Sequence, residues 1–315
     1  MSMPFEARSA ILREIGAELQ AGVLAYVTGD RENLETYVGV DALPQLPRHL
    51  EAIGKQQRLA LVLYTLGGDT NTPWPFVNFL RAYCDQLFVL VPFWAHSAGT
   101  LIALGADKIY MTRFGTLSPV DPSVTNEFNP DDPASDGDRI PIAVEDVLAF
   151  FQLASEQAGD DADAFRQLAE SVHPLALGNV KRSIEQIWLL AKKLIRLHTP
   201  AVGDAELTAL VTRLTTEPYS HSHLFNRTEA AAIGLPVEQP PEGVEDRLLA
   251  YYDELKADLE LLDKFDAGAM AQAEVVLERA YIETPGTCDA FVTRGAVSRA
   301  PANLEVASER WESIA

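Results

Sequence analysis

Ser97 lies in the segment FWAHSAGTLIALGAD, where an apolar run typical of a strand ends and a helical pattern begins. A tight strand-to-helix turn lifts a serine hydroxyl out of the sheet and places it beside the helix N-terminus. The helix dipole and free N–H groups there favour a developing alkoxide or oxyanion. Ser97 is therefore a candidate nucleophile, and an ordinary N-cap is the equally simple alternative. Ala95 stands where such turns usually carry glycine.

A pair of glycines, Gly67 and Gly68, ends the preceding apolar run in LVLYTLGGDTNTPWP. Glycines at a strand end allow a backbone N–H to point into a neighbouring site. The amides of Gly68 and Ala98 would then form an oxyanion hole for a tetrahedral intermediate. Taken alone, the pair is more simply a strand-to-helix turn. Together with Ser97 on a neighbouring strand, it supplies the geometry that acyl transfer requires.

The elements that must position these residues alternate along the first 120 residues. Short apolar runs and helical patterns follow one another, which is typical of βα units around a largely parallel sheet. The nearly continuous runs at 58–66 and 86–95 predict strands covered on both faces at the centre of that sheet. The other predicted strands are 22–29 and 108–112, and the predicted helices are 5–19, 41–53, 73–83 and 97–104.

The second half of the chain carries fewer chemical signals. Residues 124–140 predict an acidic surface loop that could act as a lid. Asn226 is expected to cap a helix together with Glu229, and Gly234 is expected to end it. The remaining predictions are helices at 143–158, 162–172, 184–197 and 245–263, a linker at 236–243, a helix or strand at 273–284 that leads with 290–297 into a hairpin, and a loose end over the last fifteen residues.

Composition excludes several classes of protein. The 315 residues are 47% apolar and 23% charged, enough for one large core or two modest ones. A net charge of −21 disfavours nucleic acid and anionic membranes as partners. The longest apolar runs are roughly half of what a bilayer-spanning helix needs, and the N-terminus lacks the pattern of a secretory signal. We expect a cytoplasmic protein with no membrane or nucleic-acid partner.

No cofactor or metal is expected. Cys84 and Cys288 lie far apart without a CxxC or Cys/His cluster, so we expect reduced thiols and no structural zinc. The chain has no ATPase motif. Any energy-driven unfolding of a substrate would need a separate partner.

Three separated segments resemble one known family. YTLGGDTNTP, AHSAGTLIALGADKIYMTRFGTLSPVDP and HSHLFNRTEAAAIGLPV occur in the order of the Clp/crotonase superfold. They are most similar to the serine dehydrogenase proteinase family, which is related to signal peptide peptidase A, over roughly residues 20–237. The resemblance implies an α/β fold: a Clp/crotonase-like ββα spiral with a mainly parallel sheet flanked by helices. We expect residues 1–237 to form this serine peptidase domain and 238–315 a helical and hairpin C-terminal extension that serves assembly or capping.

The resemblance also implies a catalytic triad in a rearranged order. Asp121 lies where Clp proteases carry their histidine, and His221 or His223 lies where they carry their aspartate. Serine dehydrogenase proteinases are described as having such a Ser, Asp, His order, and a triad is defined by geometry and roles. The implied general base is His221, oriented by Asp121, because the family pattern carries a histidine directly after Ser in this segment. His223 is the reserve.

Each partner of Ser97 also has a simpler structural explanation. Asp121 precedes a proline in a turn-like segment, and His221 lies in a polar stretch where it would be solvated. His173, in SVHPLALGNVKRS, is a second candidate base or else a histidine at a helix end before a proline. Lys181 would be the base of a Ser-Lys dyad, but a lysine base needs desolvation and its neighbours are polar.

A substrate groove is expected just beyond the glycines. Gly67, Asp69 and Trp74 are its candidate lining residues, and Phe76 is a further one. Trp74 and Phe76 are otherwise ordinary helix-to-core contacts. His96, adjacent to Ser97, is expected to be structural or to contact substrate.

The sequence favours a soluble serine peptidase that forms an acyl-enzyme on Ser97, acts on a peptide or protein substrate and assembles as a homo-oligomer by family analogy. An α/β-hydrolase esterase shares the Ser, Asp, His order, but its oxyanion glycines would precede the nucleophile by more chain. A crotonase-type acyl-CoA enzyme would need no serine at this position and would need basic contacts to phosphates. A catalytically inactive oligomer of the same fold, binding peptides or serving as a scaffold, remains open.

Overall fold

The computed structural model divides into two compact units. The first comprises Met1–Ser118, Leu194–Pro200 and Leu224–Ala315, and the second Pro119–Lys193 and Ala201–His223. The division into a peptidase domain at 1–237 and an extension at 238–315 stays a prediction, and the whole of Leu224–Ala315 belongs to the first unit. The structure describes residues 3–120, 123–124, 127–130, 139–140, 142–143, 146–147, 149–151, 153, 156, 161–199, 201–215, 223–270, 274–298 and 303–315.

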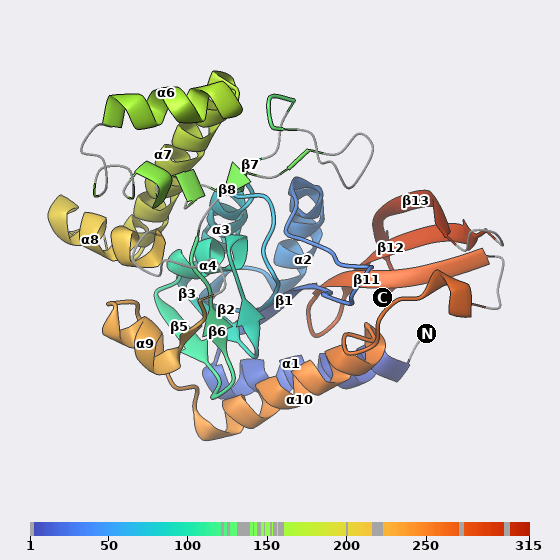
Figure 1. The fold of residues 1–315 in the computed structure, drawn as a ribbon. Coiled ribbons are helices and arrows are strands. Elements are labelled where there is room, and N and C mark those ends of the chain that lie inside the picture. Colours follow the sequence, from blue (N-terminus) through green and yellow to red (C-terminus); the bar gives the residue numbers. More distant parts are fainter. Residues whose placement is uncertain are drawn as a thin grey trace. The chain divides into compact units, whose positions relative to one another are not determined.

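An eight-stranded sheet organises the first unit (Figure 1). Its strand order is β10-β5-β3-β2-β1-β11-β12-β13. Neighbouring strands from β10 to β1 are parallel, and those from β1 to β13 are antiparallel. The predicted α/β fold with a mainly parallel sheet flanked by helices is confirmed. The bounds are β1 Gly22–Thr28, β2 Gln56–Tyr64, β3 Cys84–Val91, β5 Lys108–Met111, β10 Val237–Glu238, β11 Glu274–Glu283, β12 Cys288–Val297 and β13 Leu304–Ser313.

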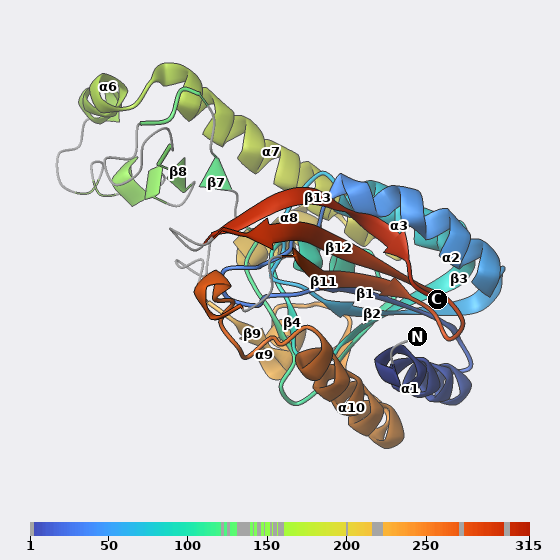
Figure 2. The same ribbon diagram turned by 90° about the vertical axis from the view of Figure 1, so that its right-hand side faces the viewer.

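Helices cover both faces of this sheet. Figure 2 shows α1 and α10 side by side beneath it, and α2 and α3 on the other side. Strand β1 serves both layers because successive side chains alternate between its faces: Ala25 and Val27 join the core with α1 and α10, and Tyr26 stacks on Phe76 of α3 at 5.0 Å. The bounds are α1 Met3–Leu19, the 3₁₀ helix η1 Val40–Gln45, α2 Leu46–Ile53, α3 Pro73–Arg81, α4 Ala98–Leu104, α9 Arg227–Ala232, α10 Glu242–Asp258 and η2 Ala267–Ala269.

A smaller sheet lies in the same unit, with strand order β4-β6-β9. Its strands are β4 Trp94–Ala95, β6 Thr116–Leu117 and β9 Phe225–Asn226. The second unit has a two-stranded sheet, β7 Ser123–Val124 with β8 Ile142–Ala143, and the helices α6 Asp161–Ser171 and α8 Asp204–Thr215. Helix α7, Pro174–Arg196, belongs to this unit as far as Lys193. Leu207, Val211 and Leu214 form the buried stripe of α8.

Most predicted strands and helices occur where the sequence places them. Prolines divide two of the predicted elements, because proline lacks the N–H that a helix or ladder needs. The predicted helix 41–53 is η1 followed by α2, with Pro44 inside η1 and another proline in the first turn of α2. The predicted strand 86–95 is β3 followed by β4, with Pro92 between them. Asn226 caps α9 as expected, since its side chain accepts the N–H of Glu229 at 3.0 Å.

Several expectations for the second half were wrong or incomplete. Of the last fifteen residues, Leu304–Ser313 are not loose, because they form β13, which pairs along β12. The C-terminal extension is one helix followed by three strands, and the linker candidate 236–243 contains β10, which pairs with β5. Helix α7 begins at Pro174, before the predicted 184–197, and α8 was not predicted. The acidic lid segment 124–140 and the helix 143–158 lie largely outside the described residues.

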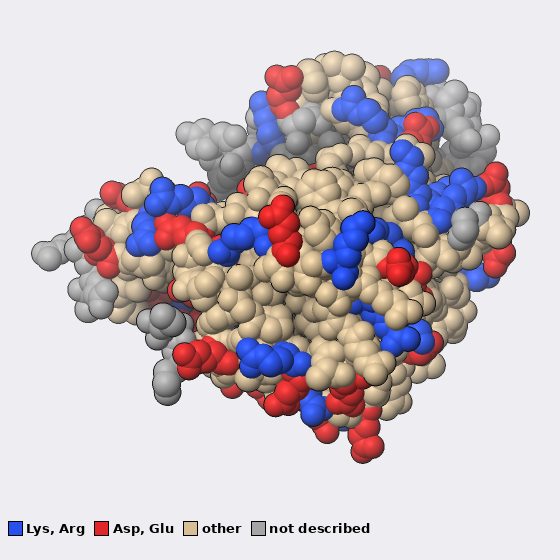
Figure 3. All heavy atoms as spheres, turned by 180° about the vertical axis from the view of Figure 1, so that it is seen from behind, with Lys and Arg blue, Asp and Glu red and all other residues tan. Residues whose placement is uncertain are grey.

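The excess of acidic residues is not gathered into one patch on the face drawn in Figure 3, where basic and acidic side chains are interspersed. Within the described ranges, no helix combines the length and apolar character needed to span a bilayer.

A buried ion pair ties the N-terminal helix to the C-terminal strands. Arg8 of α1 donates from Nε to Glu283 Oε1 of β11 at 3.0 Å and also pairs with Asp258 at the end of α10. Arg8 and Glu283 are both buried, and the Tyr251 hydroxyl donates to Glu283 at 2.6 Å. The C-terminal extension is therefore part of the core of the first unit.

We expect Arg8→Met to lower the free energy of unfolding by about 3–5 kcal/mol, because it leaves Glu283 buried without its cation. Urea unfolding followed by circular dichroism measures this loss. Arg247→Met is the matched control, since Arg247 joins the same two helices through Glu14 and Glu18 at the surface, where such pairs contribute under about 1 kcal/mol. Equal losses in the two variants would contradict this account.

Candidate active site

Ser97 occupies the predicted turn between β4 and α4 in a strained conformation. Its backbone has φ 50° and ψ −111°, values that residues other than glycine rarely adopt. Its side chain makes no capping hydrogen bond to α4, so the structure does not support the ordinary N-cap interpretation. Ser97 is half-buried, whereas every residue of α4 is buried. The Ser97 side chain is therefore attached to a fixed backbone and is only partly buried.

Two neighbouring hydroxyls hold this turn in place. The Ser97 N–H donates to Ser118 Oγ at 2.8 Å. The buried Thr100 hydroxyl lies 3.0 Å from the carbonyl of Ala95 and 2.9 Å from that of Ser118. The end of β4, the first turn of α4 and the strand that leads to Ser118 are thus connected around Ser97.

Close packing explains the small residues that follow Ser97. A β-carbon at Gly99 would lie 2.5 Å from Thr65 Cγ2, so α4 can approach β2 only with glycine there. The same hypothetical β-carbon at Gly99 would lie 3.6 Å from Ala95 Cβ, which is an ordinary van der Waals distance. Ala95 therefore fits in place of the glycine that such turns usually carry.

Gly67 and Gly68, here called the glycine corner, pack directly against the serine turn. Both have positive φ, 113° and 144°, which favours glycine. A β-carbon at Gly67 would be 2.7 Å from Ser97 Cβ and 3.0 Å from the carbonyl oxygen of His96. A parallel bridge between Thr65 and Ala95 fixes the two turns relative to each other. The juxtaposition that the sequence predicted is present.

A third segment, which the sequence analysis did not identify, closes the other side of the glycine corner. The Val38 N–H donates to the Gly67 carbonyl at 2.7 Å, and the Asp69 N–H donates to the Val38 carbonyl at 2.8 Å. A β-carbon at Gly68 would be 2.3 Å from that same Val38 oxygen. The alternating β-branched residues in TYVGV, at positions 36–40, were the available signal for this extended segment.

Two backbone amides, that of Ala98 next to Ser97 and that of Gly68 next to Gly67, lack an acceptor among the described residues. The Ala98 N–H begins α4, where no carbonyl of the helix is available to it. The Gly68 N–H likewise has no acceptor in the described part of the chain, because the Val38 bridge uses its neighbours. Paired donors of this kind can hold a developing oxyanion.

The other residues expected near the nucleophile have structural contacts. His96 Nε2 lies 2.9 Å from Thr116 Oγ1, and its ring stacks on Trp94 at 5.6 Å. Asp69 stabilises the turn that precedes α3, since its carboxylate accepts the Asn71 N–H at 3.0 Å and the Thr72 hydroxyl at 2.9 Å. Trp74 is half-buried in the first turn of α3, whereas Phe76 belongs to the core and does not line a groove.

The candidate partners of Ser97 fall outside its unit or outside the described residues. Asp121 and His221 lie outside the described residues. His173, Lys181 and His223 belong to the second unit, whereas Ser97 belongs to the first.

His173 and Lys181 have local partners within the second unit. His173 Nδ1 accepts the Leu175 N–H at 3.2 Å, which makes it an N-terminal cap of α7, and its ring stacks on Phe128 at 4.9 Å. Lys181 pairs with Glu185 at 2.9 Å and is 77% exposed, so it lacks the desolvation that a lysine base needs. His223 is half-buried.

The described residues contain no cluster of metal-ligating side chains. Cys84 and Cys288 are free, as expected. Burial raises the pKa of the Cys84 thiol to about 11 and also raises the pKa of Cys288. Neither thiol is therefore prepared to act as a thiolate nucleophile.

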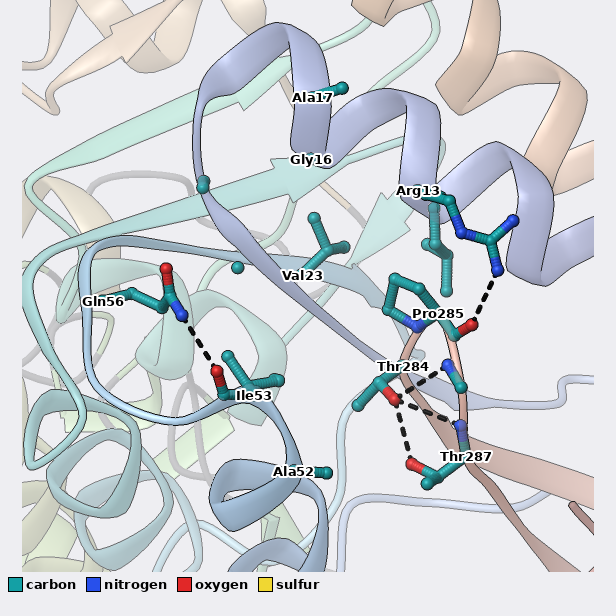
Figure 4. Close-up of a pocket in the computed structure, with 14 residues that line it drawn as sticks. Arg13, Gly16, Ala17, Val23, Ala52, Ile53, Gln56, Thr284, Pro285 and Thr287 are labelled. Carbon is teal, nitrogen blue, oxygen red and sulfur yellow. Dashed lines mark hydrogen bonds between the residues drawn. The ribbon is translucent and has the colours of Figure 1, made fainter.

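A cavity of about 520 Å³ lies at the amino ends of the parallel strands (Figure 4). Gly22 and Gln56, at the starts of β1 and β2, line it together with the turn between β11 and β12. Arg13 extends over this turn and donates to the Pro285 carbonyl at 3.1 Å. Ser97 lies beyond the carboxyl ends of the strands, so this cavity is not its site.

The family model described as ClpP-like SDH-type serine proteinase matches residues 2–133. This confirms the resemblance predicted from the motifs over the residues that include Ser97 and the glycine corner, and it supports a serine peptidase. Two uncharacterised proteins of Methanocaldococcus jannaschii are similar over 238 residues. MJ0137 is 25% identical, covering 74% of this chain and 73% of its own length, and MJ1495 is 20% identical, covering 73% and 71%.

A solved structure is also similar to part of the chain. It is a mutant of 1510-N, a membrane-bound stomatin-specific protease, with 17% sequence identity. The likeness covers 46% of this chain and 69% of that one, with a TM-score of 0.27. At that score the likeness carries no structural argument.

We expect Gly67→Ala to lower the free energy of unfolding by about 1–3 kcal/mol, because a methyl group must displace the serine turn. Gly286→Ala is the matched control, since nothing lies within 4 Å of the added β-carbon. Urea unfolding of both variants measures the difference. If Gly67→Ala were as stable as the control, the close packing against Ser97 would be contradicted.

Proposed function

We propose that this chain, whose residues 2–133 match the ClpP-like SDH-type serine proteinases, is a serine peptidase with Ser97 as its nucleophile. The observation that carries the proposal is the conformation of Ser97. Its backbone φ is positive, and its side chain packs against Gly67 without making a capping hydrogen bond to α4. A strained backbone persists only where the surrounding structure holds it, and such strain is concentrated at functional sites. The Ala98 amide next to Ser97 and the Gly68 amide next to Gly67, which have no acceptor among the described residues, would supply the electrostatic part of an acyl-transfer site.

The proposed reaction proceeds through an acyl-enzyme. Ser97 Oγ attacks the peptide carbonyl carbon while its proton passes to a general base. The carbonyl oxygen becomes an oxyanion that accepts hydrogen bonds from the Gly68 and Ala98 amides. The intermediate collapses, the C–N bond breaks, and the leaving amine takes the proton from the base. Water then adds to the ester with the same base, releasing the acid and restoring the Ser97 hydroxyl.

The proposed general base is His221, with Asp121 orienting its imidazole. This assignment rests on the sequence resemblance. His223, His173 and Lys181 are the reserve candidates, but the described contacts of His173 and Lys181 disfavour them, since one caps α7 and the other is solvated and ion-paired. An imidazole accepts a proton near neutral pH without being desolvated, whereas an exposed lysine does not.

The proposed substrate is a peptide segment that lies along the glycine corner. Gly67, Asp69 and Trp74 are its candidate groove residues, because Gly67 packs against Ser97 and the other two follow the glycine corner at the start of the next helix. A homo-oligomer is proposed from the family analogy, and sedimentation velocity tests it.

A fluorophosphonate probe tests the nucleophile. We expect the folded protein to be labelled at Ser97, and Ser97→Ala and the heat-unfolded wild type to remain unlabelled, as mass spectrometry of the digested protein will show. The reason is that phosphonylation requires both an activated hydroxyl and donors for the developing oxyanion. A folded wild type without labelling would contradict the peptidase and favour a peptide-binding scaffold.

The pH dependence of hydrolysis tests the base. With His221 as base, kcat/KM rises with pH through the near-neutral range in which imidazoles lose their proton, because only the neutral imidazole accepts the serine proton. We expect His221→Gln to lower kcat/KM by about 10²–10⁴-fold. His173→Gln, measured as the control, should keep both the wild-type kcat/KM and its rise with pH. If His221→Gln kept the wild-type profile, the assignment would be wrong.

A further inference from the structure

The extended segment that closes the glycine corner is held by residues far along the chain. This brace segment, residues 34–41, meets the glycine corner through the isolated bridge between Val38 and Gly68. The two backbone hydrogen bonds of this bridge belong to no regular ladder. Such a short pairing cannot fix its own position, so other contacts must hold the segment.

The Thr36 N–H, which donates to the Gly29 carbonyl at 2.8 Å, supplies one of those contacts, and one guanidinium of β11 supplies several more. Arg279 donates from Nε to the Leu34 carbonyl at 3.1 Å and from Nη2 to the Glu35 carbonyl. Nη1 of the same side chain donates to Thr293 Oγ1 of β12 at 3.0 Å and pairs with Glu309 of β13. The Arg279 side chain is 13% exposed, and its hydrogen bonds to the two carbonyls and to Thr293 are partly buried. The guanidinium therefore joins the brace segment to β12 and β13.

The backbone of Arg279 and a second side chain strengthen this connection. The Arg279 carbonyl accepts the Gly29 N–H at 2.8 Å and the Thr36 hydroxyl at 2.7 Å. On the far side of Val38, Trp311 Nε1 of β13 donates to Asp41 at 2.8 Å. The brace segment is thus attached to the C-terminal strands both before and after Val38.

We propose that Arg279 is a positioning residue for the oxyanion hole. By fixing the carbonyls of Leu34 and Glu35, it holds Val38 in register with the glycine corner and keeps the Gly68 amide in place beside Ser97. This inference rests on the proposed function. It also gives the C-terminal strands, which lie outside the residues matched by the family model, a role in catalysis.

The chemistry of the side chain supports this role. Two carbonyls, a hydroxyl and a carboxylate require donors that point in several fixed directions, which a planar guanidinium provides and an ammonium does not. Oxyanion donors are effective only at about 2.7–3.1 Å from the developing charge. A small displacement of Val38 would therefore reduce transition-state stabilisation more than substrate binding.

Arg279→Gln tests the proposal against Arg294→Gln as the matched control. Arg294 lies on the neighbouring strand β12, pairs with Glu312 of β13 and is 45% exposed, without any described contact to the brace segment. We expect Arg279→Gln to lower kcat by about 10–100-fold with KM changed less than about twofold, since the loss falls below that for removing an oxyanion donor. Arg294→Gln should match the wild type.

A transition-state analogue separates positioning from a merely structural role. A peptide boronate forms a tetrahedral adduct on a serine and places an oxygen where the oxyanion develops. In Arg279→Gln we expect its affinity to fall in proportion to kcat, while the same peptide without the boronate binds the Ser97→Ala and Ser97→Ala/Arg279→Gln proteins equally. If both affinities fell together with stability, Arg279 would be structural only and the proposal overturned.

A milder variant and a measurement without activity complete the test. Trp311→Phe keeps an aromatic ring but removes the donor to Asp41, and we expect it to lower kcat less than Arg279→Gln does. It takes the place of Arg279→Gln in the test if that variant does not fold. Hydrogen exchange of the Val38 and Asp69 amides should accelerate in Arg279→Gln and not in Arg294→Gln, even if the wild type proves to have no peptidase activity. Wild-type kcat and wild-type exchange in a folded Arg279→Gln would overturn the proposal.

Discussion

Two backbone turns meet at the centre of this structure with no room for a side chain between them. A β-carbon on Gly67 would lie 2.7 Å from that of Ser97, so the glycine corner and the serine turn can approach each other only because Gly67 has none. Thr65 fixes their register by pairing with Ala95, and Gly99 lets α4 pack onto Thr65. Strain at one residue is maintained here by close packing from several directions, which is how a buried scaffold can hold an unusual backbone conformation.

Local sequence patterns were sufficient to predict the strands and the two turns that meet at this contact. Continuous apolar runs identify strands buried on both faces, and paired glycines or a serine between strand and helix identify turns. The brace segment is different, because an isolated bridge arises from tertiary pairing. Arg279 has no sequence signal at all, since a charged residue in a strand usually faces water. Strand β13 was missed because most of its residues are exposed at a sheet edge and give little alternation.

The C-terminal segment is continuous with the sheet that supports Ser97. Strand β11 pairs with β1, and Arg8 and Glu283 join the first helix to the same strand. The extension is therefore core structure, and through Arg279 it reaches the backbone that flanks the glycine corner. The proposed nucleophile and oxyanion donors belong to the first unit. The candidate bases that the structure describes, His173, Lys181 and His223, belong to the second.

The most direct test of the account is a crystal structure of the wild-type protein after reaction with a small fluorophosphonate. The account predicts phosphorus bonded to Ser97 Oγ and a phosphonyl oxygen at about 2.7–3.1 Å from the amide nitrogens of both Gly68 and Ala98. An unmodified Ser97 in the treated crystal, or an adduct whose oxygens contact neither amide, would contradict it.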